Sequence, residues 1–498
     1  MLFQRFEQKQ RYWPARQWRR SRARYEPAVT AQVRVSNRYV RPFGVNHATE
    51  SPFRQAPHRI GLPLLWRLDG PGLTTSDSGE PETFVTRQLD WRQAAERRQR
   101  APVGRVVSSG HMALAKTFRL KGKEARYPVV QGGMGIGISL YELAAAVGRE
   151  ACIGTVSSAG LHRLTPRRVK QESMSPFEAA AREIADTRAD GGFAAINIMM
   201  ALPNTYEDSV RGAVAGGVDA IVSGAGLPMI LPTLVADAAG KKDHEVALVP
   251  IISSARALEL ICKRWEKQGY RADAVILEGP KAGGHLGWTH KQMNACERGF
   301  LEEYDLLDVL LEPVLDVAAK YANDAGPIPV IVAGGIFDHA DIVEALRRGA
   351  SAVQMGTRFA ATNESGGTPR FKAALVASTP ADIIVADPSW GSPCGLPFRY
   401  LRTSPLAHRQ RDAAKPYFCI CTGLLGAAGI DESARLGVRG GLARNCPEEF
   451  VRPGKDRCPA HGCADYSPLM TCGTEAHRVD RVMSTRDLIQ ELLGERTA

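Results

Sequence analysis

The sequence has no run of about 18 or more apolar residues, the length that a membrane-spanning helix needs. It also shows no secretory leader, because arginine interrupts the first apolar run. These two absences predict a cytoplasmic protein with no membrane partner. In that reducing compartment, the 10 cysteines are expected to be free thiols.

Two familiar ligand motifs are incomplete. The segment GGMGIG at 132–137 has the glycines of a dinucleotide-binding loop, but it lacks the acidic residue expected about 20 positions later at a second strand end. We therefore reject a Rossmann site. Cys458, His461, Cys463 and Cys472 do not have a familiar zinc-ligand spacing, so no metal is predicted. Unligated thiols are expected, with a metal site or a disulfide as the alternative.

The excess of basic charge is confined to the start of the chain. Residues 1–111 hold 20 Lys and Arg against 9 Asp and Glu, whereas the other 387 residues carry 44 charges of each sign. The rest of the chain therefore gives no reason to predict nucleic-acid binding. Residues 1–111 have no lasting helical or strand period, and we predict a disordered arm or an extension upstream of a true start at Met112. An arm that grips RNA or anionic lipid is the alternative.

From about Lys116 onward, short apolar runs alternate with amphipathic stretches. Eight runs are rich in Val, Ile and Ala and are apolar on both faces, which is typical of buried parallel strands. They are YPVVQ (127–131), CIGTVSS (152–158), AAINIMMA (194–201), DAIVSGAG (219–226), VALVPIIS (246–253), DAVILEGP (273–280), IPVIVAGG (328–335) and SAVQMGTRF (351–359). Eight strand–helix repeats close most naturally into an α/β (β/α)8 TIM barrel, with an open doubly wound sheet as the alternative.

The sequence thus predicts three regions. Residues 1–111 form the basic arm, residues 112–396 form the barrel, and residues 397–498 form an irregular, Cys-containing C-terminal extension. Within the extension, the segment 415–430 is predicted to be a buried helix. The segment STRDLIQELLGE at 484–495 is predicted to be an amphipathic helix with a serine N-cap.

Glycine and polar residues follow six of the eight predicted strands, at the barrel end where active sites lie. Glycine has no Cβ, so it lets a ligand approach the backbone closely. Six such ends around one rim predict a flat ligand that lies against the main chain. They include Gly133 and Met134 after the first strand, Asn197 in the third, Ser223–Gly226 in the fourth, Gly284 and His285 after the sixth, Gly334 and Gly335 after the seventh, and Gln354, Met355, Gly356 and Thr357 after the eighth.

The last two strands predict an anion site. Loops after the seventh and eighth strands hold phosphate in many such barrels. The segment AGGIFDHADI (333–342) places two glycines at the start of a helix, where free N–H groups and the helix dipole favour an anion. QMGTRF (354–359) adds another glycine and a hydroxyl group. The alternative is that both segments are only tight turns.

Together these segments resemble a known family. QGGMGIGIS, INIMMA, VSGAGLP, EGPKAGGHLG, VAGGI and VQMGTRF are similar, in order and approximate spacing, to the nitronate monooxygenase (2-nitropropane dioxygenase-like) flavoproteins. The resemblance covers about residues 128–396, and AHRVDRVMSTRDLIQELLGE resembles the tail of one bacterial subgroup. It implies a TIM barrel that holds non-covalent FMN and oxidises alkyl nitronates with O2.

The resemblance also implies roles for the residues at the rim. Asn197 would hydrogen-bond the flavin, Gly133 and Met134 would lie against its ring, and His285 corresponds to the family's catalytic histidine. With an unperturbed pKa of about 6.5, a histidine can take or give a proton near neutrality. The phosphate would be held by Gly335 and by Gln354, Met355, Gly356 and Thr357, with Gly284 and Gly334 beside the cofactor.

Two other functions are alternatives to this one. An NAD(P)H-dependent flavin reductase or enoyl-thioester (enoyl-ACP) reductase shares the barrel, the FMN and the Gly-Gly-His motif. A flavin- or RNA-binding adaptor that uses the basic arm is the non-enzymatic alternative. The expected partners are a nitronate or nitroalkane and O2, whereas nucleic acid and membrane are not expected. The sequence does not define the oligomeric state.

Overall fold

The computed structural model describes residues 117–190, 192–295, 301–385, 396–404 and 470–495, and the statements below concern these residues. The predicted basic arm (1–111) and the predicted helix at 415–430 lie outside them.

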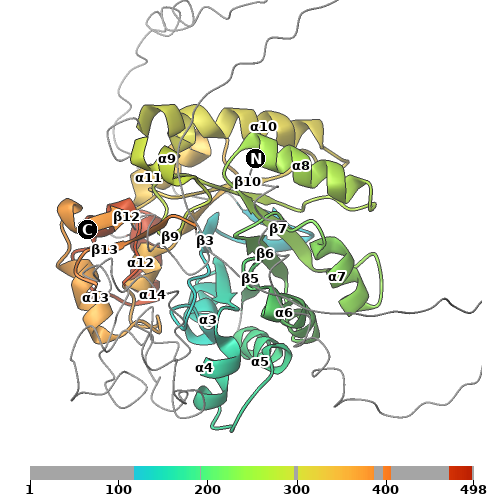
Figure 1. Ribbon diagram of the computed structural model, residues 1–498, viewed down its shortest axis with the longest axis horizontal. Coiled ribbons are helices and arrows are strands. Elements are labelled where there is room, and N and C mark those ends of the chain that lie inside the picture. The colour runs from blue at the N-terminus through green and yellow to red at the C-terminus, as the bar shows by residue number, and fades with distance from the viewer. Residues whose placement is uncertain (1–116, 191, 296–300, 386–395, 405–469, 496–498) are drawn as a thin grey trace, which may run out of the picture. The chain divides into compact units, whose positions relative to one another are not determined.

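Eight parallel strands close into a barrel in the order β10-β11-β3-β4-β5-β6-β7-β8 (Figure 1). They are β3 (Val129–Gln131), β4 (Ile153–Ser157), β5 (Phe193–Met199), β6 (Ala220–Gly224), β7 (Ala247–Ile252), β8 (Val275–Glu278), β10 (Val330–Ala333) and β11 (Ala352–Met355). Seven of the predicted strand segments contain one of these strands, and β5 begins at Phe193, one residue before its predicted segment. The predicted TIM barrel is therefore confirmed, and the open sheet is excluded.

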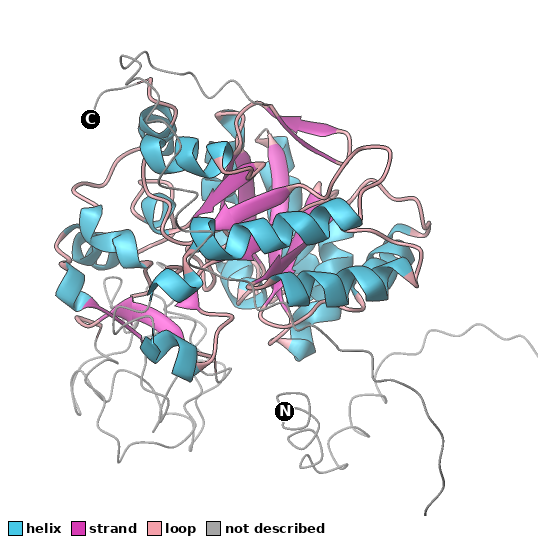
Figure 2. Ribbon diagram, turned by 90° about the horizontal axis from the view of Figure 1, so that it is seen from above, coloured by secondary structure: helices cyan, strands magenta, loops and turns pink. Residues whose placement is uncertain are grey.

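Helices surround the strands (Figure 2). The α-helices are α3 (Tyr141–Arg149), α4 (Leu161–Arg168), α5 (Pro176–Ala189), α6 (Pro203–Ala215), α7 (Leu231–Ala239), α8 (Ala255–Glu266), α9 (His290–Ala295), α10 (Leu311–Lys320), α11 (His339–Arg347), α12 (Thr357–Ala360), α13 (Pro369–Val376) and α14 (Thr485–Leu492). Short 3-10 helices lie at Leu301–Tyr304, Pro380–Asp382 and Thr474–Arg478, and a π-helix at Leu306–Leu310 precedes α10. The described residues contain no helix with the length and apolarity that a membrane crossing requires.

Local sequence signals set the helix starts. Ser175 accepts a hydrogen bond from the Glu178 N–H, and the Glu178 carboxylate accepts one from the Ser175 N–H, so a capping box opens α5. Ser484 accepts a hydrogen bond from the Asp487 N–H at 3.0 Å, and α14 follows directly. The predicted C-terminal helix with a serine N-cap is confirmed.

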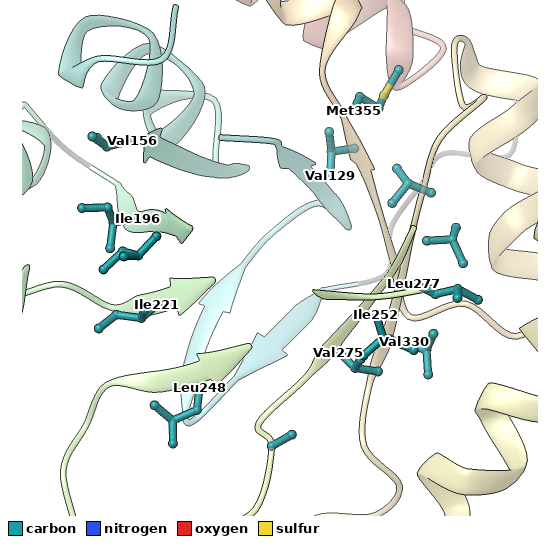
Figure 3. Packing of buried hydrophobic residues seen from close by; sticks show 14 of the residues in the cluster. Val129, Val156, Ile196, Ile221, Leu248, Ile252, Val275, Leu277, Val330 and Met355 are labelled. Carbon is teal, nitrogen blue, oxygen red and sulfur yellow. The ribbon is translucent and has the colours of Figure 1, made fainter. Parts of the chain in front are cut away.

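Two apolar clusters stabilise the barrel. Successive residues of each strand point to opposite faces, so they belong alternately to one cluster and to the other. Ala195 of β5 belongs to the cluster inside the barrel, whereas Ile196 and Ile198 pack outward against the helices. Figure 3 shows the outward-facing cluster, with Ile196 on β5 and Leu248 on β7 among its labelled members. Because both faces of each strand are buried, the strands are continuous apolar runs in the sequence.

A hairpin closes the N-terminal end of the barrel. It consists of β1 (Phe118–Leu120) and β2 (Lys123–Ala125), which pair in antiparallel fashion. Its apolar side chains join the interior cluster together with Phe193 and Ala220, the first residues of β5 and β6. The opposite end, where the strands terminate, remains for a functional site.

A small antiparallel sheet lies beyond the barrel strands. It has the order β12-β13-β9 and consists of β9 (Gly284–His285), β12 (Ile383–Val385) and β13 (Phe398–Leu401). In this sheet, Phe398 pairs with His285 and Arg399 pairs with Gly284. A strand that follows all eight barrel strands in the sequence therefore contacts the loop that carries His285.

Candidate active site

Strand alternation turns three polar side chains toward the mouth of the barrel. In β8, Ile276 faces the interior and Leu277 faces the helices, so Glu278 faces the interior at the strand end. The same alternation turns Asn197 of β5 and Gln354 of β11 inward, since each follows an interior alanine by two residues. These three side chains form the polar floor of the site.

Strand register places two of these side chains on either side of a small residue. Ala333 of β10 pairs with Glu278 of β8 on one side and with Gln354 of β11 on the other. Neighbouring strands lie about 4.8 Å apart, so the two longer side chains flank the space above Ala333. A ligand on this floor would have a carboxyl group on one side and an amide on the other.

The loop after β3 lies close to the ends of β5 and β11. A Cβ on Gly133 would overlap the Cβ of Asn197, so only glycine fits there. Gly132 donates its N–H to the Met355 carbonyl at 2.8 Å, and a Cβ on Gly356 would lie 3.7 Å from the Met134 sulfur. The structure thus brings the predicted residues after the first, third and eighth strands together.

Met355 contributes only its backbone to the candidate active site. Its side chain is buried in the outward-facing cluster between the barrel and the helices. Its carbonyl accepts the hydrogen bond from Gly132, as described above. A direct contact between the Met355 side chain and a ligand in the mouth is therefore not expected.

Two consecutive glycines follow β10 with left-handed backbone angles. Gly334 has φ +97° and Gly335 has φ +90°, where other residues are strained. A Cβ on Gly334 would lie 2.9 Å from the Ala282 nitrogen, and one on Gly335 would lie 2.8 Å from Lys281 Cδ. Gly334 therefore requires glycine because the backbone after β8 packs against it, and Gly335 requires glycine because of its left-handed φ.

One sequence prediction about this loop is wrong. We expected the helix after Gly334 and Gly335 to offer free N–H groups to an anion. Helix α11 begins at His339 and is closed by a capping box in which Asp338 accepts from the Asp341 N–H and Asp341 accepts from the Asp338 N–H. These carboxylates occupy the helix start and carry the wrong charge for an anion site.

Within the described residues, three backbone N–H groups in the loops after β10 and β11 remain free to bind a ligand. The N–H groups of Gly335, Gly356 and Thr357 donate to no other group within the described part of the protein. The Thr357 hydroxyl accepts a hydrogen bond from the Gly473 N–H at 2.9 Å. An anion site between the loops after β10 and β11 can therefore use these three groups instead of the start of α11.

Two buried polar atoms near the mouth lack a hydrogen-bond partner among the described residues. They are Gln354 Oε1 and Thr155 Oγ1. Thr155 Cγ2 would lie 3.3 Å from a Cβ on Gly133, so the hydroxyl belongs to the same part of the rim. Buried polar atoms are rarely left unpaired, and a bound polar group would supply the missing partners. The glycine-only backbone and these two atoms fit a flat ligand with hydrogen-bonding edges, such as a flavin.

His285 lies at the rim with a neutral ring. Its imidazole packs edge to face on Phe398, with 4.7 Å between ring centroids, and the residue stays partly exposed. Burial lowers the pKa of His285 to about 4, so the ring carries no charge at neutral pH. The described residues provide no hydrogen bond to either ring nitrogen, so both can serve a ligand. The preceding Gly284 has φ +71° and pairs with Arg399.

The Glu278 carboxyl titrates near neutrality. Burial raises the pKa of its carboxyl to about 7, against the opposing effects of the Arg399 charge and the Gly287 N–H. Arg399 is itself buried and donates to the carbonyls of Pro280 and Ala282, both at 2.6 Å. The sequence shows only that Glu278 lies at the end of a predicted strand. The alternation of side chains along DAVILE predicts that the Glu278 side chain points into the barrel. No local pattern indicates Arg399.

A C-terminal segment ties two loops of the site together. In this segment, residues 472–474, Gly473 donates to Thr357 after β11, and the Thr474 N–H donates to the Lys281 carbonyl after β8 at 3.1 Å. Cys472 lies so close to Gly283 that a Cβ on this glycine would overlap its backbone. We call residues 472–474 the C-terminal clasp.

The clasp contains one of the four late metal-ligand candidates. Cys472 is a buried free thiol, and burial raises its pKa to about 12, so it is an unreactive structural residue. Cys458, His461 and Cys463 lie outside the described residues. Among the residues that the structure does describe, no three His, Cys, Asp or Glu side chains gather as a metal site.

The protein is similar to a known enzyme family over most of its length. A family model described as nitronate monooxygenase matches residues 117–495. A probable nitronate monooxygenase of Staphylococcus saprophyticus is 26% identical over 294 residues, which cover 54% of this chain and 74% of that protein. The nitronate monooxygenase of Pseudomonas aeruginosa is 39% identical over 104 residues, 21% of this chain and 25% of that protein. Among solved structures, FabK from Thermotoga maritima is similar with a TM-score of 0.48 and 24% identity, covering 74% of this chain and 92% of FabK.

Proposed function

The chain belongs to the nitronate monooxygenase family and is an oxidoreductase, and we propose that it oxidises alkyl nitronates with O2 by means of bound FMN. The observation that carries the proposal is the rim itself. The loop after β8 carries the neutral His285, whose ring nitrogens have no partner among the described residues, and the strand ends carry two buried polar atoms, Gln354 Oε1 and Thr155 Oγ1, that also lack one among these residues. Flavoproteins of this kind act on small molecules, and we expect no nucleic-acid or membrane partner. The cytoplasmic location stays a prediction.

The residues of the rim would hold the cofactor in two places. Gly133 would lie against the flavin ring with Met134 beside it, and Asn197 would hydrogen-bond the ring edge. Gln354 Oε1, which is buried and has no partner in the described part of the protein, would accept a hydrogen bond from the flavin. The N–H groups of Gly335, Gly356 and Thr357 would bind the phosphate, because oriented backbone donors favour anions without a large desolvation cost.

The chemistry that FMN supplies when bound is the removal of electrons from the nitronate and their delivery to O2. His285 has the separate task of orienting the substrate. As a neutral imidazole it can donate one ring N–H to a nitronate oxygen, and the other nitrogen can accept a proton. The edge-to-face contact with Phe398 keeps the ring at the rim.

Glu278 would set the charge of the site for an anionic substrate. When its carboxyl is protonated, the floor beneath the nitronate carries no negative charge, and the acid proton can be donated as a hydrogen bond. When the carboxyl is ionised, it repels the nitronate. The pKa of about 7 places this change within the physiological range.

One experiment separates the proposed function from its alternatives. Purified full-length protein should be yellow and should release FMN, not FAD, on denaturation. Under anaerobic conditions, propyl-2-nitronate should bleach the visible flavin absorbance at once, and air should restore it. Rapid bleaching by NADH or NADPH without any response to nitronate would instead support a flavin reductase or an enoyl-thioester reductase. Colourless protein that binds no flavin would contradict the proposal.

A further inference from the structure

The loop after β8 carries a lysine whose stem crosses the Gly335 backbone. From the position of a Cβ added to Gly335, the Cδ, Cβ and Cγ atoms of Lys281 are 2.8, 3.2 and 3.6 Å away. The whole middle of the lysine side chain therefore lies along this glycine. The ammonium group is only two bonds beyond Cδ, so it stays near the loop after β10.

The ammonium of Lys281 has no acidic partner within the described residues. The carboxylates at the start of α11 are already engaged, because Arg478 pairs with Asp338 at 2.5 Å and lies 3.5 Å from Asp341. Another nearby cation, Arg358, pairs with Glu491 at 2.6 Å. Within the described part of the chain, the positive charge that Lys281 brings to this rim is thus uncompensated. A lysine packs its stem on neighbouring atoms and leaves its charged end free to meet a ligand.

Hydrogen bonds fix the backbone from which this side chain projects. Arg399 donates to the carbonyls of Pro280 and Ala282, on either side of Lys281, at 2.6 Å each. Thr474 of the C-terminal clasp donates its N–H to the Lys281 carbonyl at 3.1 Å and its hydroxyl at 3.3 Å. Three consecutive carbonyls are therefore held, and the position of the Lys281 stem follows from a rigid loop.

We propose that Lys281 binds the phosphate monoester of the flavin and supplies the positive charge that the backbone donors of this site lack. The proposal rests on the proposed flavin function. A phosphate monoester carries a charge of about −1.5 to −2 at pH 7. The N–H groups of Gly335, Gly356 and Thr357 can supply only partial charges to balance it. Lysine acts as a point charge toward phosphate, and the Lys281 stem already lies on one of these residues.

The test compares two flavins that differ only in the phosphate. Full-length holoprotein is reconstituted with FMN or with riboflavin and diluted, and the fluorescence regained on flavin release gives each Kd. In Lys281→Met, which keeps the stem and removes the charge, FMN affinity should fall about 10- to 100-fold, the effect of one charge-assisted hydrogen bond. Riboflavin affinity should stay unchanged, and Lys281→Arg should retain most of the FMN affinity.

Salt and a matched variant sharpen the comparison. FMN binding by the wild type should weaken with added salt more steeply than FMN binding by Lys281→Met, because an ion pair is screened. Lys241→Met removes an equal charge from an exposed position after α7, and it should change neither affinity.

Four results would count against the inference. Equal weakening of both flavins in Lys281→Met would show that the stem matters and the charge does not. Unchanged FMN affinity in this variant would show that Lys281 does not bind the FMN phosphate. Equal affinity of the wild type for FMN and riboflavin would refute phosphate recognition and leave the flavin function standing, whereas a wild type that binds neither flavin would refute the proposed function itself, so the two failures are distinguishable.

Discussion

Replacing Glu278 by Gln should make the enzyme faster than the wild type at high pH. The pKa of Glu278 is raised to about 7, so the carboxyl is mostly neutral at pH 6 and mostly ionised at pH 9. Two units above a pKa, only about 1% of a group is protonated. If the ionised form repels the nitronate, kcat/KM of the wild type should fall about tenfold for each pH unit above 7.

Glutamine has the same shape as the protonated carboxyl and does not titrate. We therefore expect Glu278→Gln to match the wild type at pH 6 and to exceed its kcat/KM by about 100-fold at pH 9. Two like charges at about 4 Å repel each other by about 4 kcal/mol near a protein surface, which is enough to account for a change of this size. No stability effect is needed to explain it.

The assay starts with nitronate prepared in base, and initial rates of O2 consumption are measured from pH 6 to pH 9 before the nitronate reprotonates. His285→Asn is the matched control. The pKa of His285 is lowered to about 4, so this variant should keep the inflection near pH 7 even though it is slower. A flat wild-type profile, or an inflection that persists in Glu278→Gln, would refute the assignment of this titration to Glu278.

Four further predictions can be checked with simple variants. His285→Asn should retain FMN and lower kcat/KM by about 10²- to 10⁴-fold, and unchanged turnover of nitronate would make the histidine structural. Gly335→Val should yield colourless protein, because φ is +90° and a Cβ would lie 2.8 Å from Lys281 Cδ, so full flavin occupancy by absorbance would contradict the proposed site. His244 is buried, and its pKa is lowered by burial and by a neighbouring lysine. The contribution of its neutral form to stability is therefore complete above about pH 6.5 and is lost as pH falls. His244→Gln should accordingly show a smaller drop in Tm than the wild type between pH 7 and pH 5. A protein that starts at Met112 should keep the Tm and flavin content of the full-length protein, and insoluble protein would show that the leading segment contributes to folding.

The barrel could be predicted because its strands leave an unambiguous pattern. Runs such as DAVILE are apolar on both faces since one face meets the interior and the other meets the helices. Once the strands are known, the active-site rim follows from the rule that strand ends converge there. This rule alone assigns His285 and Gly335 to the rim. Side chains alternate between the two faces of a strand, and Glu278 is the residue directly after the apolar run. The same alternation therefore predicts that the Glu278 side chain points into the barrel.

The remaining parts of the site depend on contacts between distant segments. Arg399 meets the loop after β8 across 119 positions of sequence, and no local pattern records that contact. The start of α11 was misjudged for another reason. Its segment contains both the Gly-Gly pair of a phosphate loop and the Asp338–Asp341 spacing of a capping box, and only the second sets the helix start.

The C-terminal clasp also fixes the order in which the rim can be completed during synthesis. The eight barrel strands end at Met355, so all of them leave the ribosome well before Gly473 and Thr474 do. A nascent polypeptide that has reached residue 396 carries His285, Gly335 and every barrel strand. It still lacks the partners that hold the Thr357 hydroxyl and the Lys281 carbonyl. The rim can therefore be completed only after Gly473 and Thr474 have left the ribosome, long after the last barrel strand has done so.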